Sequence, residues 1–234
     1  MSELIGIFGP SGQGKSTAVR TLDPTETFII NVTGKSLPFP GWKRHYQQKK
    51  GGNYYATEDH NTINQILTGT PQGGDGLIGR ENIKNIVIDD FQYLMSFELM
   101  NRAQEKGWDK FTQMAQHAFS VLNNARKMRE DQKIFILCHT AEKEDGTEGM
   151  KTVGKMLDEK IVPEGLFTIV LFTHVDNQED DPSKKYFFQT QTNGKRTAKS
   201  PMGMFDQYLI PNDLQYVADR IDEYYHGEPA TVEA

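Results

Sequence analysis

The chain has 234 residues, of which 36 % are hydrophobic, and this suffices for one α/β domain with its own core. The formal net charge of -6 argues against broad, sequence-independent adhesion to duplex DNA, which draws its affinity from many Lys and Arg contacts, but it allows a local basic groove. Cys138 is the only cysteine, and we find neither a signal sequence nor an apolar run of about 18 residues, so we expect no disulfide, no membrane partner and a cytoplasmic location.

Strand-like and helix-like segments alternate along the chain. Apolar, β-branched runs bounded by turn or polar residues predict strands at residues 4–8, 28–32, 86–89, 134–138 and 167–172. Helical periodicity predicts helices at residues 15–22, 61–67, 108–129 and 214–225. Because the strands alternate with helices, we expect parallel βαβ units in a single domain over residues 1–226, followed by a flexible tail at 227–234.

Polar stretches predict the edge of the sheet and its surface loops. Residues 167–173 and 186–192 flank the acidic stretch 177–185 and predict a hairpin, so a mainly parallel sheet should end in an antiparallel edge. The glycine-rich residues 69–79 and the charged run 142–149 predict mobile surface loops.

The most specific motif lies between the first predicted strand and the first predicted helix. It fits GxxxxGK[ST] at every fixed position, with the residues Gly9, Pro10, Ser11, Gly12, Gln13, Gly14, Lys15 and Ser16. Glycines let successive backbone N–H groups wrap phosphates, and the helix N-terminus adds a positive dipole end. We expect Lys15 to reach the β and γ phosphates of ATP, Ser16 to bind Mg²⁺ and Thr17 to contact the α phosphate.

Acidic and polar residues end two later strands. Residues 85–90 are typical of a Walker B strand, so Asp89 is expected to reach the metal beside the P-loop. Asp90 follows at the position where many P-loop ATPases orient the attacking water, which makes it the candidate general base. His139 or Thr140, at the next strand end, is suited to sensing the γ phosphate, and an ordinary polar strand end fits this pattern equally well.

Together these features resemble a RecA-like ATPase core and, more specifically, the compact phage-encoded RecA-like ATPases of the Sak groups. The segments that carry the likeness are GPSGQGKS, IVIDDFQYL, and FQTQTNGKRTAKSPMGMF followed by IPNDL. The resemblance implies an α/β RecA-like P-loop fold, a homo-oligomeric ring or filament, and ATP hydrolysis stimulated by single-stranded DNA in phage recombination or replication. It also implies a single-strand-binding protein as partner and the host cytoplasm as location.

The chain departs from RecA in one respect. The catalytic glutamate of RecA follows the second strand, whereas residues 27–57 here contain no Asp or Glu, so a different carboxylate must act and Asp90 is favoured. RecA-like cores also project basic residues from the hairpin across a subunit interface. By that resemblance Lys195, Arg196 and Lys199 are candidate catalytic fingers for a neighbour's γ phosphate, with a solvated basic loop as the alternative.

A basic and aromatic segment follows the second predicted strand of this acidic chain. Its charges can follow a nucleic-acid backbone while its rings stack on bases, which is typical of a single-strand site. The candidate DNA-binding residues are Trp42, Lys43, Arg44, Tyr46, Lys49 and Lys50. A lid or a subunit-contact loop fits the same composition.

Two other patterns predict no site. Gly34, Lys35 and Ser36 repeat the last letters of the P-loop, but Ile29 stands where its first glycine belongs, so they predict only a turn. The histidines are scattered without metal-ligand spacing, and zinc chemistry is not expected; among them are His45, His60, His117, His174 and His226.

Three functions fit the sequence, and they differ in the fate of ATP. The leading hypothesis is an oligomeric, DNA-stimulated ATPase. A nucleotide kinase on the same P-loop is the first alternative, although the nearest basic run lies upstream of Walker B and is rich in aromatic residues. An ATP-gated DNA- or partner-binding module with little hydrolysis is the second, because an Asp at position 90 is shorter than a Glu.

Overall fold

One central sheet organises the part of the chain that this computed structural model describes, residues 1–154, 156–181 and 185–227. Within those ranges eight strands lie in the order β10-β9-β8-β1-β5-β4-β2-β3. Their bounds are β1 Glu3–Phe8, β2 Thr27–Asn31, β3 Tyr54–Ala56, β4 Asn85–Asp89, β5 Lys133–Cys138, β8 Ile169–Val175, β9 Tyr186–Gln189 and β10 Leu209–Pro211. The strands from β8 to β3 pair in parallel, and β9 pairs antiparallel with both β8 and β10. The predicted arrangement, a mainly parallel sheet with an antiparallel edge, is confirmed.

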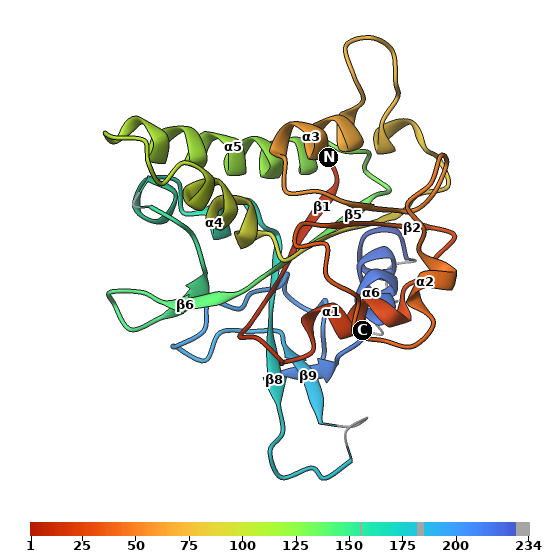
Figure 1. The fold of residues 1–234 in the computed structure, drawn as a ribbon. Coiled ribbons are helices and arrows are strands. Elements are labelled where there is room, and N and C mark those ends of the chain that lie inside the picture. Colours follow the sequence, from red (N-terminus) through yellow and green to blue (C-terminus); the bar gives the residue numbers. More distant parts are fainter. Residues whose placement is uncertain (155, 182–184, 228–234) are drawn as a thin grey trace.

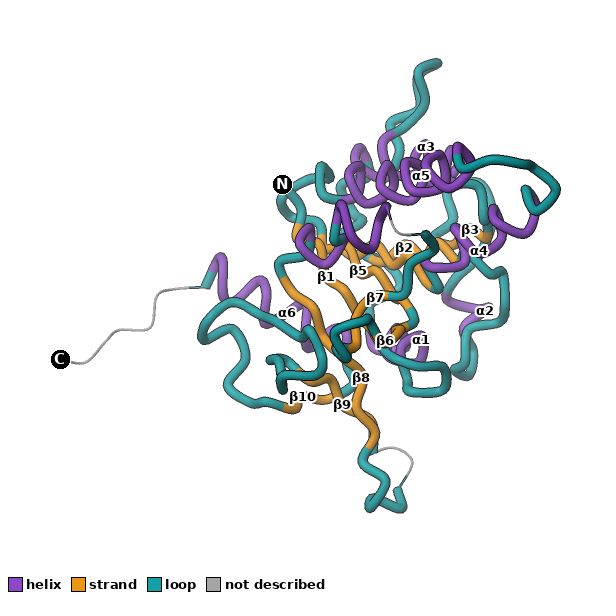
Figure 2. Tube along the Cα trace, turned by 90° about the vertical axis from the view of Figure 1, so that its left-hand side faces the viewer, coloured by secondary structure: helices purple, strands orange, loops and turns teal. Residues whose placement is uncertain are grey.

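Helices cover both faces of this sheet (Figure 1). They are α1 Lys15–Ala18, α2 Trp42–His45, α3 His60–Thr68, α4 Gln92–Asn101, α5 Asp109–Ala125 and α6 Leu214–His226. Apolar residues of α3, α4 and α5 pack on one face, and those of α1 and α6 pack on the other, so two apolar clusters sandwich the sheet. Every residue of β2, β4 and β5 is buried, as expected for parallel strands that are covered on both sides. Figure 2 shows the same layers after a quarter turn.

Several predicted boundaries were wrong. Residues 15–22 form only one α-helical turn and then a 3₁₀ turn, Val19–Thr21, where the Thr21 hydroxyl donates to the Ala18 carbonyl. The helix predicted over residues 108–129 is α5 and ends at Ala125. The run 142–149 is not simply a loop, because its ends belong to a small hairpin of β6 Thr140–Glu142 and β7 Glu148–Met150.

Other features were not predicted from the sequence. Apolar and polar residues are mixed on all sides of helix α4, so it shows no apolar stripe. Strands β3 and β10 are too short to show a strand pattern. None of the described helices has the length and apolar character that a membrane span requires. Apart from Gly227, the tail predicted at 227–234 lies outside the described residues.

Candidate functional site

The P-loop connects the end of β1 to the start of α1 at the carboxyl edge of the parallel strands. Gly12 and Gly14 have φ values of 78° and 88°, in the left-handed region that favours glycine. Gly9 is required for another reason, because a Cβ at this position would lie 1.7 Å from the Thr173 hydroxyl. That hydroxyl donates to the side-chain carbonyl of Gln13 at 3.0 Å. Strand β8 therefore supports the loop from beneath, a contact that the motif itself does not reveal.

Lys15 lies folded against its own loop. Its ammonium donates to the carbonyl oxygens of Gly9 and Pro10, at 2.7 and 2.8 Å, and only 5 % of the residue is exposed. Burial lowers the pKa of Lys15, while the charges of Asp90 and Asp89 act in the opposite direction. Both acceptors are neutral, so an anionic phosphate would be a stronger partner for this ammonium.

Asp89 is the last residue of β4 and meets the P-loop helix. The Ser16 hydroxyl donates to Asp89 Oδ1 at 2.9 Å, and the carboxylate is fully buried. Asp89 Oδ2 is also buried and has no hydrogen-bond partner among the described residues. Burial, assisted by the charge of Asp90, raises the pKa of Asp89 to about 6. A hydroxyl beside an orphaned carboxylate oxygen is a donor set that fits Mg²⁺, which prefers hard oxygen ligands.

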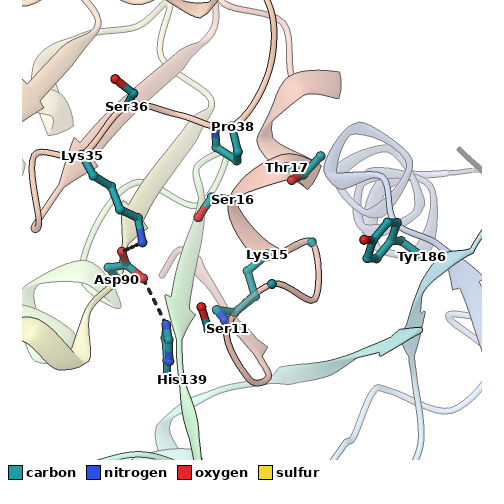
Figure 3. Close-up of a pocket in the computed structure, with 12 residues that line it drawn as sticks. Ser11, Lys15, Ser16, Thr17, Lys35, Ser36, Pro38, Asp90, His139 and Tyr186 are labelled. Atoms are coloured by element: carbon teal, nitrogen blue, oxygen red, sulfur yellow. Dashed lines mark ion pairs between the residues drawn. The ribbon is translucent and has the colours of Figure 1, made fainter. Parts of the chain in front are cut away.

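Asp90 lies beside Asp89 but has a different environment. Its φ of 62° is left-handed, which is unusual for a residue other than glycine and tolerated best by Asp and Asn. Its carboxylate pairs with the ammonium of Lys35, lies 3.6 Å from Nε2 of His139, and accepts from the Thr33 hydroxyl at 3.2 Å (Figure 3). Burial alone would raise the pKa of Asp90, but His139 and Lys35 outweigh it and lower the pKa to about 2.

Lys35 lines the cavity beside Asp90, and the sequence analysis missed it as a candidate site residue. The turn predicted for Gly34, Lys35 and Ser36 is present, with Gly34 at a φ of 66° and its N–H bonded to the Asn31 side chain. This turn follows β2, so it brings a cation beside Asp90. The absence of any acid in residues 27–57 was the available signal.

These side chains line a single cavity of roughly 370 Å³. Its lining residues come from the P-loop, from the segment after β2 and from three strand ends: Ser11, Gly12, Gly14, Lys15, Ser16, Thr17, Lys35, Ser36, Pro38, Asp90, His139 and Tyr186. Figure 3 shows Lys15, Asp90 and His139 converging from separate elements. Asp89 lies behind Ser16, and Gly9 and Pro10 contribute carbonyl oxygens to Lys15.

The two polar residues after β5 have different surroundings. His139 faces the cavity and Asp90, and its backbone N–H donates to the Gln92 side chain at 3.1 Å. Thr140 turns toward the β6–β7 hairpin, where its hydroxyl donates to Glu148 at 2.6 Å. Of these two γ-phosphate sensor candidates, only His139 is close to the cavity.

The candidate fingers lie after β9 and contact their own chain. Arg196 pairs with Glu148 at 2.9 Å, donates to the Thr173 carbonyl at 3.2 Å and lies over the Phe172 ring. Lys199 is partly buried, which lowers its pKa, and Lys195 is exposed. Their action on a neighbouring subunit stays a prediction.

The candidate DNA segment divides into an inner and an outer set of side chains. Tyr46 is 3 % exposed, its hydroxyl donates to the Leu22 carbonyl, and burial raises its pKa to about 12. In this structure Tyr46 therefore presents no ring face to a base. Trp42 packs against Tyr54 with a centroid separation of 5.5 Å and keeps part of its ring exposed. The outer set is exposed and consists of Lys43, Arg44, Lys49 and Lys50.

Comparison with known proteins gives little beyond this geometry. No protein-family model matches the chain, and no curated protein is similar to it in sequence. Among solved structures, the ATPase domain of G40P aligns over 86 % of this chain and 78 % of its own, with 13 % sequence identity and a TM-score of 0.44.

Proposed function

We propose that this chain binds Mg²⁺-ATP in the P-loop cavity, hydrolyses it, and couples the turnover to single-stranded DNA in phage recombination or replication. The observation that carries the proposal is the convergence of Lys15, the Ser16–Asp89 pair and Asp90 at one cavity. A phosphate-binding loop, a metal-binding pair and a buried carboxylate are the parts that phosphoryl transfer to water requires.

The chain's own groups hold the phosphates. Backbone N–H groups of the glycine-rich loop and the start of α1 provide positive dipole ends. Lys15 exchanges the carbonyls of Gly9 and Pro10 for phosphate oxygens, and this exchange replaces two neutral acceptors by an anion.

Ser16 and Asp89 would hold Mg²⁺, which when bound neutralises charge that develops on the phosphate oxygens. Asp89 contributes its orphaned Oδ2, the buried atom that the described residues leave without a hydrogen bond. A bound cation would remove the cost of keeping this carboxylate charged while it is fully buried.

Asp90 accepts the proton of the attacking water, and its ion pair with Lys35 controls whether the carboxylate is free to do so. The Lys35 ammonium occupies one oxygen of Asp90, so the carboxylate is charged but not free. The γ phosphate of ATP would offer Lys35, which is 54 % exposed and able to swing, a second anionic partner. His139 stays beside the other oxygen of Asp90 and keeps the carboxylate oriented.

Single-stranded DNA would follow the outer set of the basic segment. Lys43, Arg44, Lys49 and Lys50 are exposed and suited to phosphate, and the exposed part of Trp42 is suited to stacking.

In an oligomer Lys195, Arg196 and Lys199 would act on the neighbouring γ phosphate. Arg196 must first release Glu148, so assembly and this ion pair compete. A single-strand-binding protein is the proposed partner.

The test is ATP turnover with and without single-stranded DNA, using wild type and Asp90→Asn. Binding of a labelled oligonucleotide is measured in the same samples by fluorescence anisotropy. We expect DNA to stimulate wild-type turnover severalfold and to leave the variant at background. Wild-type turnover that equals the Asp90→Asn background in both conditions would exclude the ATPase.

One observation favours a second candidate, an ATP-gated binding module with little hydrolysis. The Lys35–Asp90 ion pair makes Asp90 a weak base for as long as it persists, because its pKa is lowered to about 2. If this candidate is correct, a non-hydrolysable ATP analogue will change DNA affinity as much as ATP does, while turnover stays negligible. A true ATPase will instead show DNA affinity that decays as ATP is consumed.

A further inference from the structure

A second cluster of chemically active side chains lies on the helical layer, apart from the P-loop cavity. His60 begins α3, Glu98 lies on α4 and His117 lies in the middle of α5. One ligand atom from each of the three lies within 4.8 Å of the other two. Figure 1 shows these three helices together on one face of the sheet, and none of the three residues lines the P-loop cavity.

The backbone around the two histidines is held by contacts that need no ion. Asn64, one turn after His60, donates to the Ser120 hydroxyl at 2.9 Å, and Asn124 donates to Asn64 at 3.0 Å. This polar seam fixes α3 against α5, which Figure 2 also shows side by side. His60 and His117 are therefore brought together by helix packing, and their rings stack with a centroid distance of 3.7 Å.

Glu98 completes the cluster from the third helix. Its two carboxylate oxygens lie 2.9 and 3.0 Å from Nδ1 of His117, and Arg102 holds one of them at 2.8 Å. Asp59 lies 3.9 Å from Nδ1 of His60. A guanidinium that holds a carboxylate, as Arg102 holds Glu98, is the kind of outer partner that orients a metal ligand.

We propose that His60, Glu98 and His117 form a binding site for one divalent transition-metal ion of the Zn²⁺ type. Two imidazoles and a carboxylate are ligands that Zn²⁺ accepts, in contrast to the oxygen-only set of Ser16 and Asp89. The same residues line a small cavity of about 10 Å³, together with Glu58 and apolar side chains of α4 and α5. A cavity of that size holds about one water-sized particle.

Binding requires only local side-chain movement. Zn²⁺ with bonds of about 2.0 to 2.1 Å holds tetrahedral ligand atoms roughly 3.4 Å apart. The widest spacing, at most 4.8 Å, therefore closes by about an ångström, and the 2.9 Å contact between Glu98 and Nδ1 of His117 opens slightly. The stacked rings turn so that a lone pair of each points to the ion. The side chains are 20 to 33 % exposed and have room for such rotation.

The ion would join three helices, one of which, α4, contacts residues that line the P-loop cavity. Helix α4 begins two residues after Asp90, and Gln92 on its first turn accepts from the backbone of His139. Tying Glu98 to α3 and α5 would hold α4 in place. The inference stands independently of the proposed ATPase activity.

The experiment measures binding of Zn²⁺ alone to the untagged, metal-stripped full chain by isothermal titration calorimetry. Co²⁺ provides a second probe, because its visible absorption reports tetrahedral coordination. Wild type should bind one Zn²⁺ per chain and melt at a higher temperature when Zn²⁺ is present. A His60→Gln, His117→Gln double variant should lose affinity by at least about 100-fold and lose the Co²⁺ absorption.

The controls separate loss of the site from loss of the fold. His45→Gln, His226→Gln removes two exposed histidines elsewhere and should bind Zn²⁺ as wild type does. Glu98→Gln keeps the size of the side chain and should weaken binding while the metal-free melting temperature stays close to wild type. The inference is overturned if wild type and the folded His60→Gln, His117→Gln variant bind Zn²⁺ equally, or if Co²⁺ gives no tetrahedral absorption with wild type.

Discussion

The P-loop cavity has residues suited to ATP, and the basic segment of residues 42–50 has residues suited to single-stranded DNA, but the two regions are built differently. At the cavity, Asp89, Asp90 and His139 lie at the end of a buried strand or directly after one, and Lys15 begins α1 directly after the P-loop. The basic segment is one helical turn, α2, followed by a loop, and its tyrosine points into the core.

The difference shows which sequence patterns fix side-chain direction. Parallel strands bring their carboxyl ends to one edge of a sheet, so polar residues directly after such strands must meet there. Composition in a loop carries no such constraint, and a ring placed there can pack inward as readily as outward. Tyr46 does so, while Lys43 and Arg44 stay exposed.

The largest expected effect belongs to the cavity. Asp90→Asn should lower kcat for ATP hydrolysis by about 10²- to 10⁴-fold because it removes the base, and ATP affinity should stay near wild type. Asn also tolerates the left-handed backbone at this position. Steady-state kinetics and a nucleotide-binding titration measure the two quantities.

The matched control for that variant is Asp131→Asn. Asp131 is likewise paired with cations, Arg129 and Lys84, and its pKa is also lowered to about 2, mainly by Arg129. Asp131 does not line the P-loop cavity. Equal loss of kcat in both variants would mean that a general charge effect, and not catalysis by Asp90, is responsible.

The basic segment should give a smaller effect, and on DNA rather than on ATP. Trp42→Ala should weaken binding of single-stranded DNA by about 1 to 3 kcal/mol, the usual contribution of one stacked base. Trp108→Ala is the control, since that ring is 82 % exposed on another part of the chain. Fluorescence anisotropy measures the affinities. Unchanged binding by Trp42→Ala would remove the segment from the DNA site.

Tyr46 tests whether the inward-facing ring of the basic segment contributes to DNA binding or only to stability. Tyr46→Phe keeps the buried ring and loses only the hydroxyl that donates to Leu22. DNA affinity should therefore equal that of wild type, whereas stability to urea should fall by about 1 kcal/mol. A clear loss of DNA affinity would mean that the tyrosine leaves the core when DNA binds.

The smallest expected effect concerns Lys35. Without its ammonium the pKa of Asp90 should rise from about 2 toward the ordinary range of a carboxyl, because a group that favours the charged form is gone. Asp90 must be charged to act as a base, so the acidic limb of the kcat/KM–pH profile, which reports the enzyme before ATP binds, should move to higher pH in Lys35→Met. At neutral pH we expect a change of about fivefold or less, since Lys35 is 54 % exposed and an ion pair with one solvated partner contributes about 1 kcal/mol.

Lys84→Met is the control for Lys35→Met, because Lys84 makes a comparable ion pair with Asp131 away from the cavity. Its kcat/KM–pH profile should coincide with that of wild type. An acidic limb that stays in place in Lys35→Met would show that the ion pair does not govern the reactive state of Asp90.

Much of the fold and the phosphate site could be predicted because local patterns determine them. The P-loop follows from its fixed spacing, and the buried strands β2, β4 and β5 follow from apolar runs. Helix α4 lacks an amphipathic stripe, so periodicity could not reveal it. Lys35 and the His60–His117 stack depend on segments that meet only in the folded chain, and no spacing in the sequence encodes such a meeting.

The most direct test of the central claim is Mg²⁺-dependent ATP hydrolysis by wild type and Lys15→Ala. Lys15 is the one cation bonded to the P-loop carbonyls among the described residues, so its loss should remove binding to the phosphates and to the transition state. We predict turnover in wild type that disappears with EDTA and falls by about 10²- to 10³-fold in Lys15→Ala. Hydrolysis that survives in Lys15→Ala at the wild-type rate would contradict the assignment of this cavity as the ATP site.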